Sequence, residues 1–210
     1  MKAFFLATGL LYTFICEAQK DYEFTDTRKK TESFKKIAQK DIRADLASFT
    51  LAGIDESVGK EALKKISFKS FGSDSMKFEG DNIKAIVSTT PFDPAKHKLD
   101  YDEKYLIKID RKTYYGGYGF MPKTSVSRVI LTIGNDTIAI PATAYSDLHN
   151  LNLTYNDKGT QRTANGIYRS KDGHKLYIYL LSKDAKGSYE VTWVIQDKKY
   201  LRRVLDYEMI

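Results

Sequence analysis

The sequence predicts an α+β domain in which N-terminal helices pack on a mainly antiparallel, meander-type β-sheet. Two observations carry this prediction. Apolar residues in the first third of the chain recur every three or four positions, which is the period of an amphipathic helix. From about residue 76 onward the apolar period falls to two, which is typical of strands with one buried face. The hydrophobic fraction of 42% in 210 residues is enough to bury a core.

The helical part is expected over residues 19–72. A first helix is indicated by apolar residues that fall on one stripe, namely Phe34, Ile37, Ala38, Ile42 and Leu46. Asp55 is suited to cap a second helix that includes Val58 to Ile66, and Gly53 marks the break between the two. We expect both helices to pack on the sheet, because the stripe is narrow and lacks the Trp common in membrane-surface helices.

The β-rich part is expected over residues 73–210, and 19–210 is expected to form a single domain. Strands are predicted at residues 82–90, 104–112, 128–133, 137–140, 166–170, 174–182, 188–195 and 199–207. The turns between the last four are short, which favours a meander. Residues 142–151 are expected to form a short helix or a connecting loop, because Tyr145, Leu148 and His149 share a helical face.

Residues 1–18 are expected to be a cleavable signal peptide. Lys2 precedes an apolar run from Ala3 to Ile15 that is too short to span a bilayer comfortably. Residues 16–18 then place small side chains at the positions read by signal peptidase. The bulky Ile15 before the cysteine disfavours the competing interpretation, a lipoprotein. We therefore expect an exported protein, periplasmic or secreted, with no transmembrane segment after cleavage.

Cleavage would also remove the single cysteine of the chain, Cys16. The exported domain would then contain no disulfide, no cysteine nucleophile and no thiolate metal ligand. Such a domain is held by its core alone, which is more typical of a bacterial envelope protein than of a eukaryotic secreted one.

No motif in the sequence predicts catalysis, a metal site or a cofactor. The chain has no G-x-S-x-G, H-E-x-x-H, G-x-G-x-x-G or Walker A pattern, and no EF-hand loop. His97, His149 and His174 are isolated in the sequence. Residues 146–149 bring Ser, Asp and His close together, but neighbours in sequence do not make a catalytic triad. The acids Asp100 and Asp102 are expected in a solvated turn.

The most distinctive surface candidate is an aromatic and glycine-rich loop at residues 114–120. Its candidate ligand-binding residues are Tyr114, Tyr115, Tyr118 and Phe120, because glycines let a backbone approach a ligand while aromatic rings stack on it. The alternative is a glycine-rich bend whose rings pack into the core. The formal charge of +7 favours anionic partners, or only aids solubility.

The C-terminal hairpin combines an aromatic strand with a basic one. Trp193 shares a strand face with Tyr189, Val191 and Ile195, which predicts a place in the core. The basic residues that follow the turn are expected to protect an edge strand, and they include Arg202 and Arg203.

Residues 172–179 (DGHKLYIY) and 189–203 (YEVTWVIQDKKYLRR) resemble the C-terminal part of uncharacterised exported proteins of Bacteroidetes bacteria. The resemblance covers about the last 80 residues. It implies a bacterial source and an exported protein, and it transfers no functional residue.

Three hypotheses for function follow. The first is a non-enzymatic, envelope-associated binding protein whose partner is an anionic glycan or another envelope protein, with no nucleic acid expected. The second is an extracytoplasmic hydrolase, which would need a cleft that collects at least two of His97, His149, Asp100, Asp102 and Asp147. The third is an assembly role through an exposed sheet edge.

Overall fold

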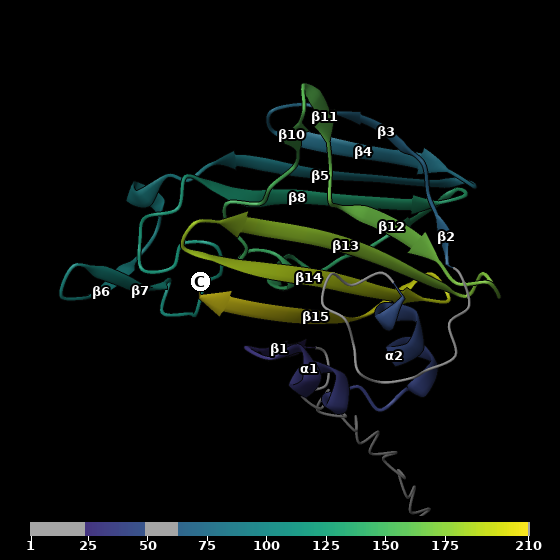
Figure 1. Cartoon of the computed structure of the whole chain (residues 1–210), viewed down its shortest axis with the longest axis horizontal. Coiled ribbons are helices and arrows are strands. Elements are labelled where there is room, and N and C mark those ends of the chain that lie inside the picture. Colours follow the sequence, from purple (N-terminus) through teal and green to yellow (C-terminus); the bar gives the residue numbers. More distant parts are fainter. Residues whose placement is uncertain (1–23, 49–62, 210) are drawn as a thin grey trace, which may run out of the picture.

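The computed structural model describes residues 24–48 and 63–209 (Figure 1). The helices are α1 (Lys30–Lys36), α2 (Lys40–Ala47) and the short 3-10 turns η1 (Pro94–Lys96) and η2 (Ala142–Ala144). The strands are β1 (Phe24–Thr27), β2 (Lys64–Lys65), β3 (Phe68–Phe71), β4 (Ser75–Gly80), β5 (Ile83–Pro91), β6 (Leu99–Asp102), β7 (Tyr105–Ile109), β8 (Thr124–Ile133), β9 (Asp136–Ile138), β10 (Tyr155–Asp157), β11 (Thr160–Arg162), β12 (Gly166–Arg169), β13 (Lys175–Asp184), β14 (Gly187–Gln196) and β15 (Lys199–Met209).

Two sheets share one hydrophobic core. The first sheet has the strand order β1-β15-β14-β13-β12-β2, and the second has the order β3-β4-β5-β8-β9. Trp193 and Ile178 of the first sheet belong to the same buried cluster as Phe78, Val87 and Leu131 of the second. The described part of the chain is therefore mostly β, with helices near its N-terminal end, and the predicted fold class is confirmed.

The predicted meander is present as β12 to β15. Each strand pairs antiparallel with the next, with Ile178 opposite Trp193 and Trp193 opposite Arg203. Asp197 and Lys198 both have positive φ, which is the backbone of the tight turns that join twisted antiparallel strands. Trp193, Tyr189, Val191 and Ile195 lie in the core as their spacing predicts.

The first predicted helix is interrupted. The chain is extended at Ile37 between α1 and α2, and Ile37, Ile42 and Leu46 pack with Phe34 against the outer face of the first sheet. Ile37 and Ile42 would lie about 140° apart on one continuous helix, so the break allows both to be buried. Ala38, which the periodicity placed on the stripe, is exposed instead.

Strands also form in the part of the chain that the sequence predicts to be helical. Gly53 and most of the second predicted helix lie outside the described residues, but Lys64 and Lys65 at its end form β2. β1 and β3 also fall between residues 19 and 72. Residues 142–151 form η2 and a loop, so the loop alternative describes this segment better than a helix does.

The prediction that Arg202 and Arg203 protect an edge strand is wrong. β1 pairs in parallel with β15, with Phe24 opposite Arg203, so β15 lies inside the sheet and both arginines are buried. The local sequence pattern of β15 cannot reveal a parallel partner that lies more than 170 residues away.

Among the residues that the structure describes, no helix has the length and hydropathy needed to cross a bilayer.

Candidate functional site

A groove of 730 Å³ is the candidate functional site, and we call it the aromatic groove. Four segments that are distant in sequence line it: the start of the α1 region, β7, the 113–119 loop and the end of β15. The lining residues are Arg28, Lys29, Tyr105, Leu106, Ile107, Thr113, Tyr114, Tyr115, Tyr118, Gly119, Tyr207 and Glu208. Three of the four predicted ligand-binding residues therefore line one hollow of the size that binds small ligands.

Gly116 lets the loop approach the segment that contains His149. Its φ is +94°, and a Cβ built on it would lie 2.1 Å from the carbonyl oxygen of His149. The neighbouring Tyr115 N–H donates to the Asp147 carbonyl at 2.9 Å, and the His149 N–H donates to the Tyr115 carbonyl at 2.9 Å. Only glycine fits this position, so the glycine content of the loop serves packing as well as conformation.

Tyr118 adopts a left-handed backbone conformation at φ +51°, which is rare for a bulky residue. Its ring lies against Gly187, where an added Cβ would be 2.7 Å from the Tyr118 Cε1 atom. Its buried hydroxyl has no hydrogen-bond partner within the described residues. Burial and the nearby Asp184 carboxylate raise the pKa of Tyr118 above its ordinary value. Such strain at a ring that lines a groove is typical of binding sites.

Tyr114 connects the loop to the β6–β7 hairpin. Its hydroxyl lies 2.9 Å from the Leu106 carbonyl oxygen, and the Leu106 N–H donates to the Gly119 carbonyl at 2.9 Å. The Tyr114 ring meets His149 edge-on at 5.7 Å between centroids. These contacts fix the loop relative to β7, so bonds within the chain hold the two walls of the groove together.

Tyr115 belongs to the core, and only its edge lines the groove. The side chain is 8% exposed, and its hydroxyl donates to Asp26 at 3.1 Å. The Tyr115 ring also packs on Tyr207 at 5.1 Å and lies 5.7 Å from the Arg203 guanidinium. Burial and the nearby Asp26 carboxylate raise the pKa of Tyr115. For this residue the alternative of a ring packed into the core describes the structure better than a free binding surface does.

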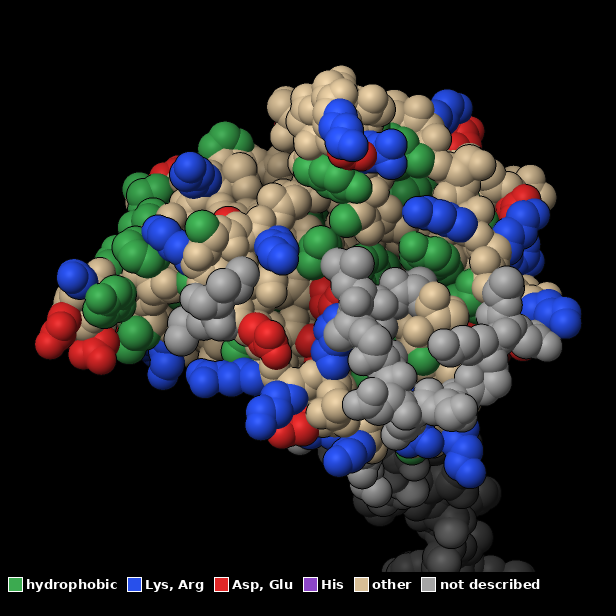
Figure 2. All heavy atoms as spheres, viewed as in Figure 1, with side chains coloured by type: hydrophobic (Ala, Val, Ile, Leu, Met, Phe, Trp, Pro, Cys, Tyr) green, Lys and Arg blue, Asp and Glu red, His purple; other side chains and the backbone are tan. Residues whose placement is uncertain are grey.

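An exposed apolar patch adjoins the aromatic groove. Phe120 is exposed, and its ring meets Tyr105 edge-on at 6.3 Å, with the Lys186 Nζ atom 3.2 Å from the Phe120 centroid. The patch comprises Tyr101, Tyr105, Ile107, Phe120 and Met121. Hydrophobic side chains gather over the β6–β7 end of the face shown in Figure 2. Exposed apolar side chains gathered in this way mark interaction surfaces.

The charge beside the groove is mainly positive. Arg28 and Lys29 line both the aromatic groove and an adjoining hollow of 560 Å³, to which Lys183 also contributes. Arg28 lies 5.8 Å over the Tyr207 ring, a cation–π arrangement. None of these three cations forms an ion pair within the described part of the chain, and Glu208 is the acid beside them that lines both hollows.

The other acids in this region have partners of their own. Glu190 pairs with Lys30, and Asp206 accepts hydrogen bonds from Thr27 and Ser33. Arg28, Lys29 and Lys183 therefore remain available to an anionic ligand.

The residues named for a hydrolase lie outside the two hollows described above, although His97 and His149 both contact the Phe92 ring, at 4.8 and 5.4 Å between ring centroids. His97 pairs with Asp110 at 2.7 Å, and Asp100 and Asp102 belong to β6. Asp147 is engaged by Arg203 at 2.7 Å. None of these residues, nor His149, lines the aromatic groove or the adjoining hollow.

His149 does contact a hydroxyl that the sequence did not single out. Its Nδ1 atom lies 2.9 Å from the Ser125 Oγ atom. His149 is almost fully buried, and this burial lowers its pKa to about 4. Within the described ranges no three His, Cys, Asp or Glu side chains gather as a metal site requires.

The sequence missed the residues that complete the groove. Arg28, Lys29, Tyr105 and Tyr207 are ordinary surface residues in sequence, and only the pairing of β1 with β15 and the fold of the β6–β7 hairpin bring them beside the loop. Exposed Tyr105 and Ile107 did alternate with buried Leu106, which was the one local sign of an apolar outer face on β7.

Comparisons with family models, curated proteins and solved structures find no match for this chain.

Proposed function

We propose that this chain is an exported, non-enzymatic binding protein of the bacterial envelope that holds an anionic glycan in the aromatic groove. The supporting observation is that aromatic rings and unpaired cations from four separate segments line one hollow. The export part of the proposal rests on the signal-like residues 1–18, which lie outside the described part of the chain.

The chemistry of the groove suits an acidic sugar chain. Tyr105, Tyr118 and Tyr207 offer ring faces or edges on which the apolar face of a sugar can stack, and the hydroxyls of Tyr105 and Tyr207 can hydrogen-bond. Arg28 and Lys29 supply charge-assisted hydrogen bonds to carboxylate or sulfate groups. The adjoining hollow with Lys183 extends the basic surface, so a chain of several sugars would contact cations along its length.

The test is calorimetric titration of residues 19–210 with a hexamer of galacturonic acid and with maltohexaose, a neutral control of equal length. We expect binding of the acidic hexamer only, weakening as salt rises because the contacts are solvent-exposed ion pairs. Tyr105→Ala and Arg28→Gln should each weaken binding about tenfold. Tyr155→Ala is the matched control, because Tyr155 is similarly exposed, 49% against 44% for Tyr105, but lies on the separate β10–β11 hairpin.

Three results would overturn the proposal: equal affinity for both sugars, no binding of either, or equal loss in the Tyr155 control. Capture of another envelope protein that depends on Tyr105 and Phe120 would instead favour the alternative partner. Chromatography after the titration shows whether the acidic hexamer has been cleaved to shorter sugars. Such cleavage would favour the alternative of an extracytoplasmic hydrolase.

A further inference from the structure

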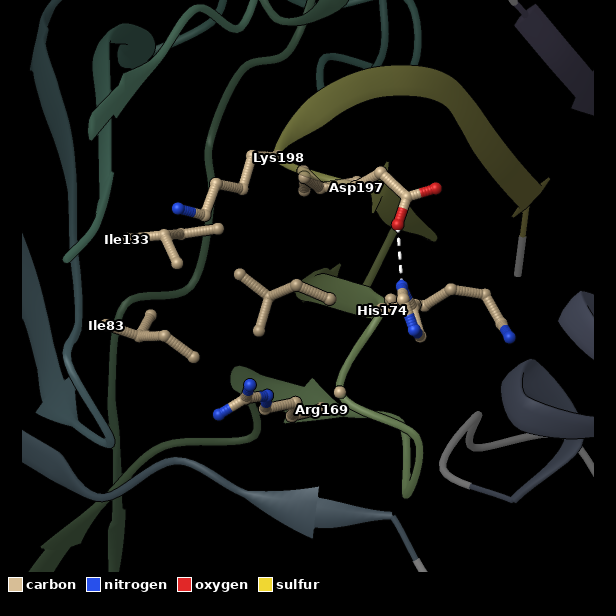
Figure 3. A pocket seen from close by; sticks show the side chains of 10 residues that line it. Ile83, Ile133, Arg169, His174, Asp197 and Lys198 are labelled. Carbon is tan, nitrogen blue, oxygen red and sulfur yellow. Dashed lines mark hydrogen bonds and ion pairs between the residues drawn. The ribbon is translucent and has the colours of Figure 1, made fainter. Parts of the chain in front are cut away.

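The end of the two sheets that lies away from the β6–β7 hairpin contains a second hollow, of 320 Å³ (Figures 1 and 3). Two cross-strand pairs form its apolar floor. Ile83 of β5 lies opposite Ile133 of β8 in one sheet, and Leu176 of β13 lies opposite Ile195 of β14 in the other. Ile83, Leu176 and Ile195 belong to the main core cluster, so the hollow reaches the core between the sheets.

The rim of this hollow is polar and comes from the turns that follow β12 and β14. It is formed by Arg169, Gly173, His174, Lys175, Asp197 and Lys198. The Arg169 side chain turns toward the side on which Ile83 lies, and the Lys198 side chain extends toward Ile133 (Figure 3). Gly173 makes room for Arg169, because a Cβ at Gly173 would lie 2.9 Å from the Arg169 Nη2 atom.

Arg169 is the cation that remains unpaired here. Four acids lie around this end, and each has a basic partner: Asp197 with His174, Asp136 with Lys198, Asp172 with Lys175, and Asp81 with Lys64. Arg169 is half-buried and forms no ion pair with any residue in the described ranges. An arginine without a counter-ion beside an apolar floor is an arrangement that an anion with an apolar tail would complete.

We infer that this hollow is a second binding site and that its ligand is a small aliphatic monocarboxylate. One unpaired guanidinium matches one carboxylate, which can accept two parallel N–H hydrogen bonds from it. Four branched aliphatic side chains match an unbranched alkyl chain, whose transfer from water supplies the rest of the affinity. The volume of 320 Å³ is near the lower limit for small-molecule sites and excludes a large ligand.

This site is independent of the proposed function. It shares no lining residue with the aromatic groove. A sugar chain would find no aromatic ring on its floor, whereas the aromatic groove has tyrosine rings beside the aliphatic Leu106 and Ile107. Either proposal can therefore fail without the other.

The experiment uses octanoate as the probe. One control is 1-octanol, which keeps the alkyl tail but has no charge, and the other is acetate, which keeps the charge but has no long tail. Calorimetry should show octanoate binding, with each control at least tenfold weaker. Arg169→Gln should weaken octanoate binding about tenfold or more, because a charge-assisted pair is lost. Arg128→Gln is the matched control, since Arg128 is an exposed arginine of β8, and it should leave the affinity unchanged.

A backbone amide NMR titration locates the site and keeps the test valid even if one variant is unstable. Octanoate should shift the amides of Ile83, Leu176 and Asp197 and leave the 113–120 loop unmoved. The inference is overturned if octanoate does not bind, if Arg169→Gln binds it as well as the wild type does, or if the shifts lie outside this hollow.

Discussion

The charged cluster around Arg203 shows how single residues join distant segments. Its guanidinium bonds Asp26 of β1, Asp147 of the loop before His149, and the Ala144 carbonyl. Burial lowers the pKa of Arg203, but its bonds to Asp147 and Asp26 more than offset this, so the pKa lies above the ordinary value. Asp26 also accepts from the Tyr115 hydroxyl. One buried arginine therefore connects β1, β15 and the loop that forms the aromatic groove.

His149 provides a prediction about pH. Its burial lowers the pKa in the folded protein from 6.5 to about 4, although the nearby Asp147 favours the charged form. As the pH falls through the window from 6.5 to 4, the unfolded chain gains a proton that the folded chain does not. The free energy of unfolding should therefore fall by about 2 kcal/mol between pH 7 and pH 4.5 through this residue. Urea unfolding at both pH values measures the change.

The control for this prediction compares the pH dependence of the unfolding free energy in the wild type with that in His149→Gln. His149→Gln cannot titrate, so its unfolding free energy should vary less with pH than that of the wild type, by about the same 2 kcal/mol. An identical pH dependence in the wild type and His149→Gln would show that His149 is not a buried neutral group.

At the scale of elements, Gly116 of the 114–120 loop is constrained both by its positive φ and by its close neighbours. A comparison with Gly134, which has only the first constraint, separates the two effects. Gly116 has positive φ and almost no room for a side chain, whereas Gly134 in the β8–β9 turn has φ +62° and nothing within 4 Å of a built Cβ. Gly134→Ala should cost about 1 kcal/mol of unfolding free energy, from backbone strain alone. Gly116→Ala should cost about 3 kcal/mol or more, because a methyl group would also collide with the His149 carbonyl.

Thermal or urea unfolding of both variants measures these costs. Gly116→Ala should in addition weaken binding of the acidic hexamer, because the loop must move away from the segment around His149. Equal destabilisation by the two substitutions would mean that the loop does not pack as closely as the structure describes.

The strands could be predicted from sequence because their signal is local. The period of two at residues 82–90 and 188–195 located β5 and β14 nearly to their ends, and short turns located the meander. The break at Ile37 and the pairing of β1 with β15 could not be predicted in this way. Both depend on the surface of a sheet whose strands lie more than 130 residues further along the chain.

The candidate site was predictable only in part, for the same reason. Clustered aromatic residues and glycines single out Tyr114, Tyr118 and Phe120 in the sequence. Nothing in the sequence distinguishes Arg28 or Tyr207, which reach the groove from the two ends of the described chain. The sequence also cannot predict that Arg169 has no ion-pair partner within the described residues. An unpaired cation can be recognised only when the partners of all the surrounding acids are known.

At the scale of the whole molecule, stability should be concentrated in the middle of the six-stranded sheet. β13, β14 and β15 have partners on both sides, and the largest fully buried side chains lie on β13 and β14, namely Trp193, Tyr177, Tyr179 and Tyr189. The β6–β7 and β10–β11 hairpins form separate two-stranded sheets with exposed aromatic residues such as Tyr105 and Tyr155.

Native-state hydrogen exchange should therefore show global protection in β13 to β15 and rapid local opening of both hairpins. The β6–β7 hairpin forms one wall of the aromatic groove, so saturation with the acidic hexamer should slow exchange in β7 by mass action and leave β10–β11 unchanged. Octanoate should instead protect the turns after β12 and β14. Uniform protection across the hairpins and the central strands would contradict this distribution, because it would require the hairpins to unfold only with the core.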